Sequence, residues 1–389
     1  MQNPLTWLSK WRFSHKPLIT IEISRNRLIH NLNQFAKLAP NNSIAPTLKS
    51  NAYGHGIIEV AKIIENEIVH NQKLKANIPF FVVDSYFEAI ALRAKGIKTP
   101  LLIIGYTRPE TILTSSLRNI SFTITDIQTL FAIKNTAKNI LVHLKIDTGM
   151  HRQGILPEEI DRSLTIINEN KKIILEGICS HLSDADGTKN EFTQSQIDLW
   201  NNSVDKIISQ FSNIKYIHLS NTYGHSYSKS IKANVSRLGI GLYGLADGLS
   251  DTLHLKPVLE MKTIITSIKK LNKDESVGYN NTFKAENDMT IATIPVGYFE
   301  GVDRRLSNRG FVEILPNKTP CPIIGRVSMN ITSIDITSIP DVKVGSEVLV
   351  ISNNPQSKCS IESIAKLCDT ITYESIVGIP GHLKRVVIE

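Results

Sequence analysis

The stretch Thr47-Leu48-Lys49-Ser50-Asn51-Ala52-Tyr53-Gly54-His55-Gly56 contains a lone lysine at the end of an apolar run. A turn of small residues follows, and residues 57–64 then repeat apolar side chains with helical spacing, which predicts strand, loop and helix. We therefore expect Lys49 at the carboxyl end of a strand, where parallel α/β folds place their chemistry. A desolvated lysine there can form a Schiff base, although most lysines are solvated surface charges.

Outward from this stretch, short apolar runs alternate with helical segments such as residues 86–95 and 192–211. The eight predicted strands span residues 44–49, 80–84, 101–105, 121–125, 140–146, 175–182, 216–221 and 237–243. Alternating strands and helices favour parallel βαβ units, and eight of them predict an α/β fold with a closed (β/α)8 barrel of the TIM type. An open doubly wound sheet ranks second, because no G-x-G-x-x-G follows the first strand.

After about residue 248 the pattern changes to closely spaced strands joined by turns, with one short helix expected near residues 360–367. This half predicts a mainly β domain. Residues 18–23 alternate like a strand, and Ser24 is a candidate cap for the first helix. We therefore divide the chain into an N-terminal extension (1–17), a barrel domain (18–247) and a mainly β C-terminal domain (248–389).

Composition narrows the possible functions. The 44 Lys and Arg against 36 Asp and Glu leave a net charge of +8 in 389 residues, but the basic residues are scattered, which argues against nucleic-acid binding. The four cysteines have no metal-like spacing and are too few for a disulfide framework. The sequence contains no run of about 18 apolar residues, so we expect no membrane-spanning helix. The N-terminus lacks the pattern of a secretory signal. We therefore expect a cytoplasmic enzyme without a metal site and without a membrane partner.

Further polar residues fall at or near the ends of other predicted strands. These residues are Lys145, His181, Asn221 and Arg237. In a barrel the carboxyl ends of all strands share one mouth, so we expect them to surround Lys49.

Several stretches together are similar to one family. Ala45-Pro46-Thr47-Leu48-Lys49 and the residues that follow resemble the cofactor-lysine signature of alanine racemases, which use pyridoxal 5'-phosphate (PLP) on a barrel of fold-type III. Lys145-Ile146-Asp147-Thr148-Gly149-Met150-His151-Arg152 and Ser236-Arg237-Leu238-Gly239-Ile240-Gly241 match two more of the family's motifs. At least five motifs occur in the family's order between about residues 19 and 387.

The resemblance implies a set of cofactor contacts. Arg152 is expected to bond the PLP phenolic oxygen and the substrate carboxylate, which suits guanidinium geometry. Lys145 stands where several members carry a carbamylated lysine. Arg237 faces the pyridine nitrogen and, unlike a carboxylate, favours the unprotonated ring, which restricts the enzyme to proton transfer; His218 orients it. The remaining implied cofactor-binding residues, most of them near the phosphate, are Tyr53, His181, Asn221, Thr222, Gly239 and Ile240.

Racemisation needs one acid/base group on each face of the Cα atom, because a single base tends to return its proton to the same side. Lys49 supplies the group that acts on the D-enantiomer. By resemblance, Tyr279 in Ser276-Val277-Gly278-Tyr279 acts on the L-enantiomer, oriented by His181. In the family this tyrosine reaches into the neighbouring subunit, so the resemblance implies a homodimer with composite active sites.

Some positions depart from the family pattern. The stretch Gly325-Arg326-Val327-Ser328-Met329-Asn330 has Ser and Asn where many relatives have Cys and Asp, but the Met329 N–H keeps its implied role in binding the substrate carboxylate. Gly381 stands where some members carry a pocket-narrowing tyrosine, and His151 beside Arg152 is unusual. Residues that fall where relatives line the substrate entrance are Tyr298, Arg304 and Asp186.

We therefore expect PLP-dependent interconversion of L-alanine and D-alanine, supplying D-alanine for cell-wall peptidoglycan. Gly381 keeps open a racemase of the same fold that acts on serine or a broader range of amino acids. A decarboxylase of the same fold should carry an acidic residue in place of Arg237. A non-catalytic PLP carrier should lack both the β domain and Tyr279.

Overall fold

The computed structural model describes residues 16–70, 73–187, 190–249 and 252–389. The chain forms two compact units. We call Ser24–Val258, together with Glu389, the barrel unit, and Leu259–Ile388, together with the chain up to Ile23, the β unit. Each unit is described by itself.

The barrel unit contains eight parallel strands, as predicted. A parallel sheet joins β3 to β8 in chain order, and β2 pairs in parallel with β9. A parallel bridge from Thr47 to Val82 links β2 to β3, and the Asn234 N–H donates to the Ile217 carbonyl at 3.0 Å to link β9 to β8, so the ring closes. The strands are β2 (Ser43–Pro46), β3 (Phe81–Val83), β4 (Leu101–Ile103), β5 (Ile120–Ile124), β6 (Ile140–Lys145), β7 (Ile173–Cys179), β8 (Tyr216–His218) and β9 (Val235–Leu238).

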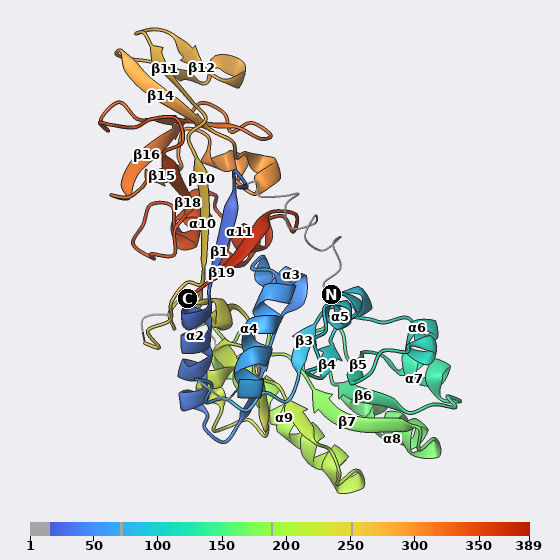
Figure 1. Cartoon of the computed structure of the whole chain (residues 1–389). Coiled ribbons are helices and arrows are strands. Elements are labelled where there is room, and N and C mark those ends of the chain that lie inside the picture. Colours follow the sequence, from blue (N-terminus) through green and yellow to red (C-terminus); the bar gives the residue numbers. More distant parts are fainter. Residues whose placement is uncertain (1–15, 71–72, 188–189, 250–251) are drawn as a thin grey trace, which may run out of the picture. The chain divides into compact units, whose positions relative to one another are not determined.

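Helices follow most of these strands and flank them in the cartoon (Figure 1). Ser24 caps the first helix as expected, because its Oγ accepts from the Arg27 N–H at 3.4 Å. The helix after Lys49 buries Ile57, Val60 and Ile64 at helical spacing, which confirms the predicted amphipathic pattern. The helices are α2 (Arg25–Leu38), α3 (Lys49–Tyr53), α4 (Ile57–His70), α5 (Tyr86–Ala94), α6 (Pro109–Thr114), α7 (Ile127–Ile133), α8 (Ile160–Glu169) and α9 (Asn190–Gln210).

The β unit is mainly β, as predicted. Nine strands form one sheet in the order β11-β14-β17-β16-β15-β18-β10-β1-β19, and β12 and β13 form a separate pair. The predicted helix near residues 360–367 is α10 (Ile361–Leu367), and a second short helix, α11 (Thr372–Val377), was not predicted. The strands are β1 (Thr20–Ser24), β10 (Leu259–Ile264), β11 (Ser267–Leu271), β12 (Ser276–Val277), β13 (Phe283–Lys284), β14 (Met289–Ile294), β15 (Phe311–Ile314), β16 (Thr319–Ile324), β17 (Thr332–Asp335), β18 (Glu347–Ile351) and β19 (Lys384–Ile388).

Strand β1 corrects the predicted domain range 18–247. It does not join the barrel but pairs antiparallel with β10, with Ile21 opposite Met261. Its burial explains why: Ile21 and Ile23 are buried while Thr20 and Glu22 are partly exposed, the alternation of a strand covered on one face. The barrel strand β5, by contrast, is buried at every position. The predicted extension 1–17 lies outside the described residues except for its last two positions.

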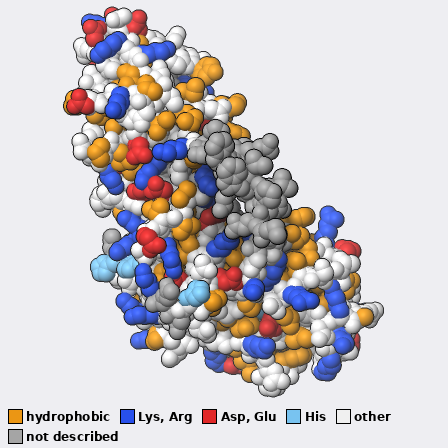
Figure 2. All heavy atoms as spheres, viewed as in Figure 1, with side chains coloured by type: hydrophobic (Ala, Val, Ile, Leu, Met, Phe, Trp, Pro, Cys, Tyr) orange, Lys and Arg blue, Asp and Glu red, His pale blue; other side chains and the backbone are white. Residues whose placement is uncertain are grey.

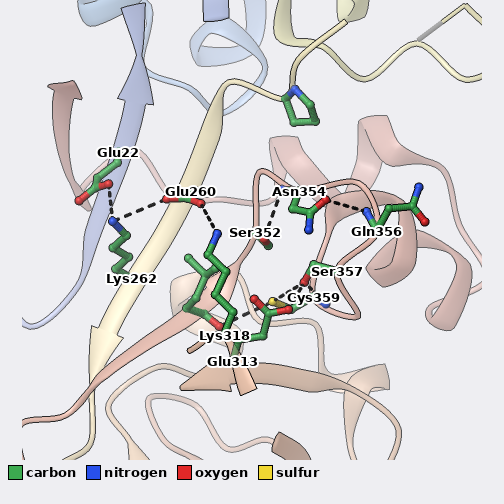
Figure 3. A network of polar contacts seen from close by, with 12 residues as sticks. Glu22, Glu260, Lys262, Glu313, Lys318, Ser352, Asn354, Gln356, Ser357 and Cys359 are labelled. Carbon is green, nitrogen blue, oxygen red and sulfur yellow. Dashed lines mark hydrogen bonds and ion pairs between the residues drawn. The ribbon is translucent and has the colours of Figure 1, made fainter. Parts of the chain in front are cut away.

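A polar network crosses the β unit beside β1 and β10 (Figure 3). The Lys262 amine lies 2.6 Å from the Glu22 carboxylate and 3.6 Å from Glu260, which in turn lies 3.8 Å from Lys318. Nearby, the Ser357 hydroxyl donates to the buried Glu313 carboxylate at 2.6 Å. The ion pair between Lys262 and Glu22 joins β10 to β1, so we assign this network a role in strand pairing rather than in chemistry. Its contribution to stability is small, because partly exposed ion pairs contribute about 0–1 kcal/mol each.

On the face seen in Figure 2, Lys and Arg side chains are interspersed with Asp and Glu over both units. This distribution agrees with the scattered basic residues of the sequence. Among the described residues, no helix has both the length and the apolar character needed to cross a membrane.

Candidate active site

The predicted strand-end residues of the barrel unit lie at or within three residues of strand ends, although the predicted strand 237–243 is a strand only at residues 237–238. Lys145 is the last residue of β6, and Arg237 lies within β9, one residue before its end. His181 and Asn221 follow the ends of β7 and β8 by two and three residues. Lys49 follows the last residue of β2 by three positions and begins α3.

The residues after Lys49 form a left-handed turn. Ser50, Asn51 and Ala52 have φ between 53° and 55° and ψ between 44° and 51°, close to ideal left-handed values, and Tyr53 has φ 51°. Left-handed geometry costs roughly 1–2 kcal/mol for each residue with a side chain. Such a run persists only where surrounding contacts hold it, and strained backbone of this kind gathers at functional sites.

Tyr243 braces the strand that leads into this turn. Its buried hydroxyl donates to the Thr47 carbonyl at 2.8 Å, and its ring stacks on His55 with centroids 4.3 Å apart. Tyr243 was not predicted to be a site residue. It lies in the apolar run that follows Arg237, and this place in the sequence was the available signal.

Arg237 is buried, with 7% of its surface exposed, and makes five hydrogen bonds. It donates to His218 Nδ1 at 2.6 Å, to His181 Nδ1 at 3.1 Å, and to the carbonyls of Ser180, His218 and Leu219 at 2.6, 2.9 and 3.1 Å. A guanidinium only donates, so both imidazoles must accept at Nδ1 and carry their proton on Nε2. Burial, reinforced by the charge of Arg237, holds the pKa of both histidines well below 6.5.

A third imidazole, that of His143, extends this arrangement and was not predicted from the sequence. His218 Nε2 lies 2.8 Å from His143 Nδ1, so His218 donates and His143 carries its proton on Nε2. That nitrogen faces Glu176 Oε2 at 3.8 Å, and the Ser121 hydroxyl donates to the same carboxylate oxygen at 2.6 Å. A Cβ atom at Gly177 would lie 2.6 Å from His143 Nδ1, so this glycine makes room for the His143 ring.

The predicted phosphate residues form a cradle. Thr222 Oγ1 accepts from the Gly239 N–H at 3.2 Å and from the Gly241 N–H at 3.3 Å, which leaves its own O–H to donate elsewhere. A Cβ atom at Gly239 would lie 2.8 Å from the Tyr53 hydroxyl, so a side chain there would displace this hydroxyl. Burial raises the pKa of Tyr53 to about 12, which keeps its phenol protonated and able to donate. Ile240 begins the short turn η3 (Ile240–Tyr243), and the Asn221 side chain accepts from the Gly224 N–H at 2.8 Å.

Cationic side chains gather around His181. Burial is the main cause of its low pKa, and the charges of Arg237, Arg152, Lys145 and Lys49 add to it. Burial also lowers the pKa of Lys145, with Arg152 and Arg237 acting in the same direction. A half-buried cluster of cations attracts anionic ligands.

Comparison with known proteins supports one family. A family model described as alanine racemase, N-terminal domain, matches residues 23–247, and one described as alanine racemase, C-terminal domain, matches residues 258–387. The chain belongs to the alanine racemase family.

Individual members of the alanine racemase family match over nearly the whole chain. An alanine racemase of Fusobacterium nucleatum subsp. nucleatum is 34% identical over 377 residues, 95% of this chain and 99% of that protein. The alanine racemase structure from Clostridium difficile 630 superposes with a TM-score of 0.87 at 30% identity, covering 97% of both chains. The Bacillus anthracis alanine racemase with bound L-Ala-P superposes with a TM-score of 0.86 at 25% identity, covering 97% and 96%.

In the domain that matches the alanine racemase C-terminal model, the predicted site residues are exposed. Tyr279 begins the turn η4 (Tyr279–Asn281) with 67% of its surface exposed, and Met329 is 55% exposed. The Asn330 side chain donates to Glu300 at 2.6 Å.

Of the predicted entrance residues, Tyr298 and Arg304 belong to the β unit, as does Gly381. Tyr298 donates its N–H to the Ser328 carbonyl at 3.0 Å, beside Met329, and Arg304 begins the turn η6 (Arg304–Leu306). Asp186 belongs to the barrel unit. Gly381 is exposed, and its neighbour His382 stacks on Phe299 with ring centroids 5.0 Å apart.

Proposed function

We propose that the protein is a PLP-dependent racemase that interconverts L-alanine and D-alanine. One observation carries this most strongly: the buried cation Arg237, held by two neutral imidazoles, occupies the barrel mouth where a decarboxylase of this fold should place an acid. The names of the relatives and the L-Ala-P in the Bacillus anthracis title support alanine as the substrate.

The residues present fit PLP. The Thr222 and Tyr53 hydroxyls offer donors for a phosphate, and the Gly239 N–H holds Thr222 Oγ1 in place. Lys49 offers an amine for the cofactor's carbonyl, and Arg152 a guanidinium for an oxyanion. When bound, PLP supplies a ring that spreads the negative charge left at Cα when its proton is removed.

The chain's own residues would then divide the work. Arg152 and the Met329 N–H bind and orient the substrate carboxylate. The Lys49 amine takes or returns a proton on one face of Cα, and the Tyr279 phenol does so on the other. Arg237 keeps its five hydrogen bonds and its proton, so it limits the reaction to proton transfer at Cα.

Two further features belong to this proposal. The lowered pKa of Lys145 favours its neutral amine, which is the form that adds CO₂, so a carbamate there would give Arg152 an anionic partner. The exposed Tyr279 supports a homodimer in which this side chain completes the partner's site. We place the enzyme in the cytoplasm, where its D-alanine would supply cell-wall peptidoglycan.

The test is D-alanine formation from L-alanine by the purified protein, with and without added PLP. We expect activity and a visible absorbance band of lysine-bound cofactor. Lys49→Ala should lose the band and reduce activity by about 10⁴-fold or more, because both the attachment point and one acid/base group disappear.

Lys62→Ala, at an exposed position of α4, is the control and should behave like the wild type. No D-alanine from cofactor-loaded wild type, or a Lys49→Ala variant that keeps the band, would overturn the proposal.

A broader substrate range is the second candidate, because Gly381 is exposed and has no side chain to narrow a pocket. Rates on L-alanine, L-serine and larger L-amino acids separate the two candidates. A kcat/KM for L-serine equal to or above that for L-alanine would favour the broader racemase.

A further inference from the structure

We propose that Glu88 is a positioning residue for Lys49, acting through the left-handed turn that follows this lysine. The inference rests on the proposed function, in which Lys49 carries the cofactor. Glu88 belongs to α5, near the end of β3, and lies 39 positions away from Lys49 in the sequence.

The Glu88 carboxylate gathers three backbone amides from two parts of the barrel unit. Its Oε1 accepts from the Ser50 N–H at 2.7 Å and more weakly from the Asn51 N–H at 3.4 Å. Its Oε2 accepts from the Asp84 N–H at 2.7 Å, directly after the last residue of β3. One side chain therefore ties the lysine-bearing turn to the end of the neighbouring strand.

The bond to Ser50 fixes Lys49 itself. The Ser50 N–H belongs to the peptide unit that joins Lys49 to Ser50, so holding this N–H holds the ψ angle of Lys49. That angle, together with the position of β2, sets the direction in which the lysine side chain leaves the backbone.

The turn needs such an anchor because its conformation is unfavourable on its own. Four successive residues with side chains, Ser50 to Tyr53, have φ between 51° and 55°. Their summed cost is of order several kcal/mol. A carboxylate that accepts from consecutive amides forms charge-assisted hydrogen bonds, which are about twice as strong as neutral ones.

Other contacts hold the rest of the turn. The Ala52 N–H donates to the Leu48 carbonyl at 2.7 Å, across Lys49, and the Asn51 side chain accepts from the Ile57 N–H at 3.0 Å, at the entry into α4. Neither of these two bonds includes the peptide unit between Lys49 and Ser50. Loss of Glu88 should therefore leave the barrel folded while the start of the turn, with Lys49, gains freedom.

The same chain offers a matched control. Glu65, on α4, also accepts from two consecutive backbone amides, Lys98 and Thr99, both at 2.7 Å, and from the Thr99 hydroxyl at 2.7 Å. It thus makes the same kind of contact in the same unit, with a loop before β4 in place of the lysine turn. Glu65→Ala and Glu88→Ala each remove three hydrogen bonds to one carboxylate.

The experiment compares both variants with the wild type as holoenzymes. We expect both to lower the thermal midpoint, and Glu88→Ala alone to lower kcat by about tenfold to a hundredfold, because small displacements of a reacting group carry such costs. KM should change less than kcat. Glu88→Ala should also shift the pH at which the band of lysine-bound cofactor titrates, which a purely structural loss would not do.

Glu88→Gln keeps one acceptor oxygen and should recover part of kcat, and it carries the test if Glu88→Ala does not fold. Equal kcat and equal band titration in the Glu65 and Glu88 variants would overturn the inference. Its failure is distinct from failure of the proposed function: a wild type without cofactor band or racemase activity refutes the function, whereas an active wild type with an unaffected Glu88→Ala refutes only the role of Glu88.

Discussion

The polar group around Arg237 in the barrel unit and the predicted site residues of the β unit differ in burial, although Arg152 of the barrel unit is also exposed. In the barrel unit Arg237 and His218 are buried and fixed by hydrogen bonds within the unit. In the β unit Tyr279 and Met329 lie on turns with more than half of their surface exposed. Burial and fixed partners preorganise a group for the charge it must meet. An exposed phenol on a turn gains a defined environment only against another surface, which is what a composite site would provide.

Tyr279→Phe tests this contrast with the largest expected effect. Removing the hydroxyl should lower kcat/KM by about 10²–10⁴-fold in both directions, because racemisation needs both acid/base groups and its equilibrium constant is one by mirror symmetry. The distinguishing measurement is exchange of the Cα proton with deuterium from solvent. Exchange should persist from D-alanine, where Lys49 acts, and vanish from L-alanine.

Tyr106→Phe is the matched control, because Tyr106 is also more than half exposed but lies in the barrel unit. Exchange from both enantiomers in Tyr279→Phe at the rates of Tyr106→Phe would remove Tyr279 from the mechanism.

His143→Leu tests whether the buried partners of Arg237 matter. The change leaves the Nε2–H of His218 without an acceptor, which costs about 1–3 kcal/mol of stability and frees this ring to turn. We expect kcat to fall by about tenfold or less, with the pH profile of kcat displaced from that of the wild type.

Glu176→Gln should have the smaller effect of the two, because its carboxylate lies 3.8 Å from His143, beyond hydrogen-bonding distance. A His143→Leu enzyme with wild-type kcat and pH profile would show that the His143 imidazole only fills space.

The parts of the molecule that were predictable from the sequence are those with a local signal. Apolar runs separated by helical spacing predicted the eight barrel strands, and strand ends predicted where Lys145, His181 and Arg237 lie. The partner of β1 was not predictable in this way, because pairing with β10 joins residues that are about 240 positions apart. The alternation of apolar Ile21 and Ile23 with polar residues was the available clue in the sequence, because it is typical of a strand covered on one face.

The supporting residues of the site escaped prediction for a related reason. His143 and Glu88 act through hydrogen bonds to residues 75 and 38 positions away, and each looks like an ordinary strand or helix residue in its own segment. The left-handed turn was also hidden, because Ser50, Ala52 and Tyr53 rarely adopt positive φ, and only contacts from elsewhere hold them there. Resemblance to a family supplied roles, but it did not supply these contacts.

The smallest expected effect concerns acid stability of the barrel unit. His225 is 3% exposed and lies against Phe35, with ring centroids 5.0 Å apart, and burial lowers its pKa from 6.5 to about 4. The unfolded chain binds a proton at His225 below about pH 6.5, whereas the folded chain does so only near pH 4. The stabilising contribution is therefore complete above pH 6.5 and is lost as the pH falls to 4.

This difference corresponds to about 3 kcal/mol in the free energy of unfolding across the window. His225→Gln cannot take up the charge, so its free energy of unfolding should fall less steeply between pH 6.5 and 4 than that of the wild type. The slope decides the matter, because it is independent of any uniform loss of stability in the variant. A His225→Gln slope equal to that of the wild type would mean that the barrel histidine takes up its proton without unfolding.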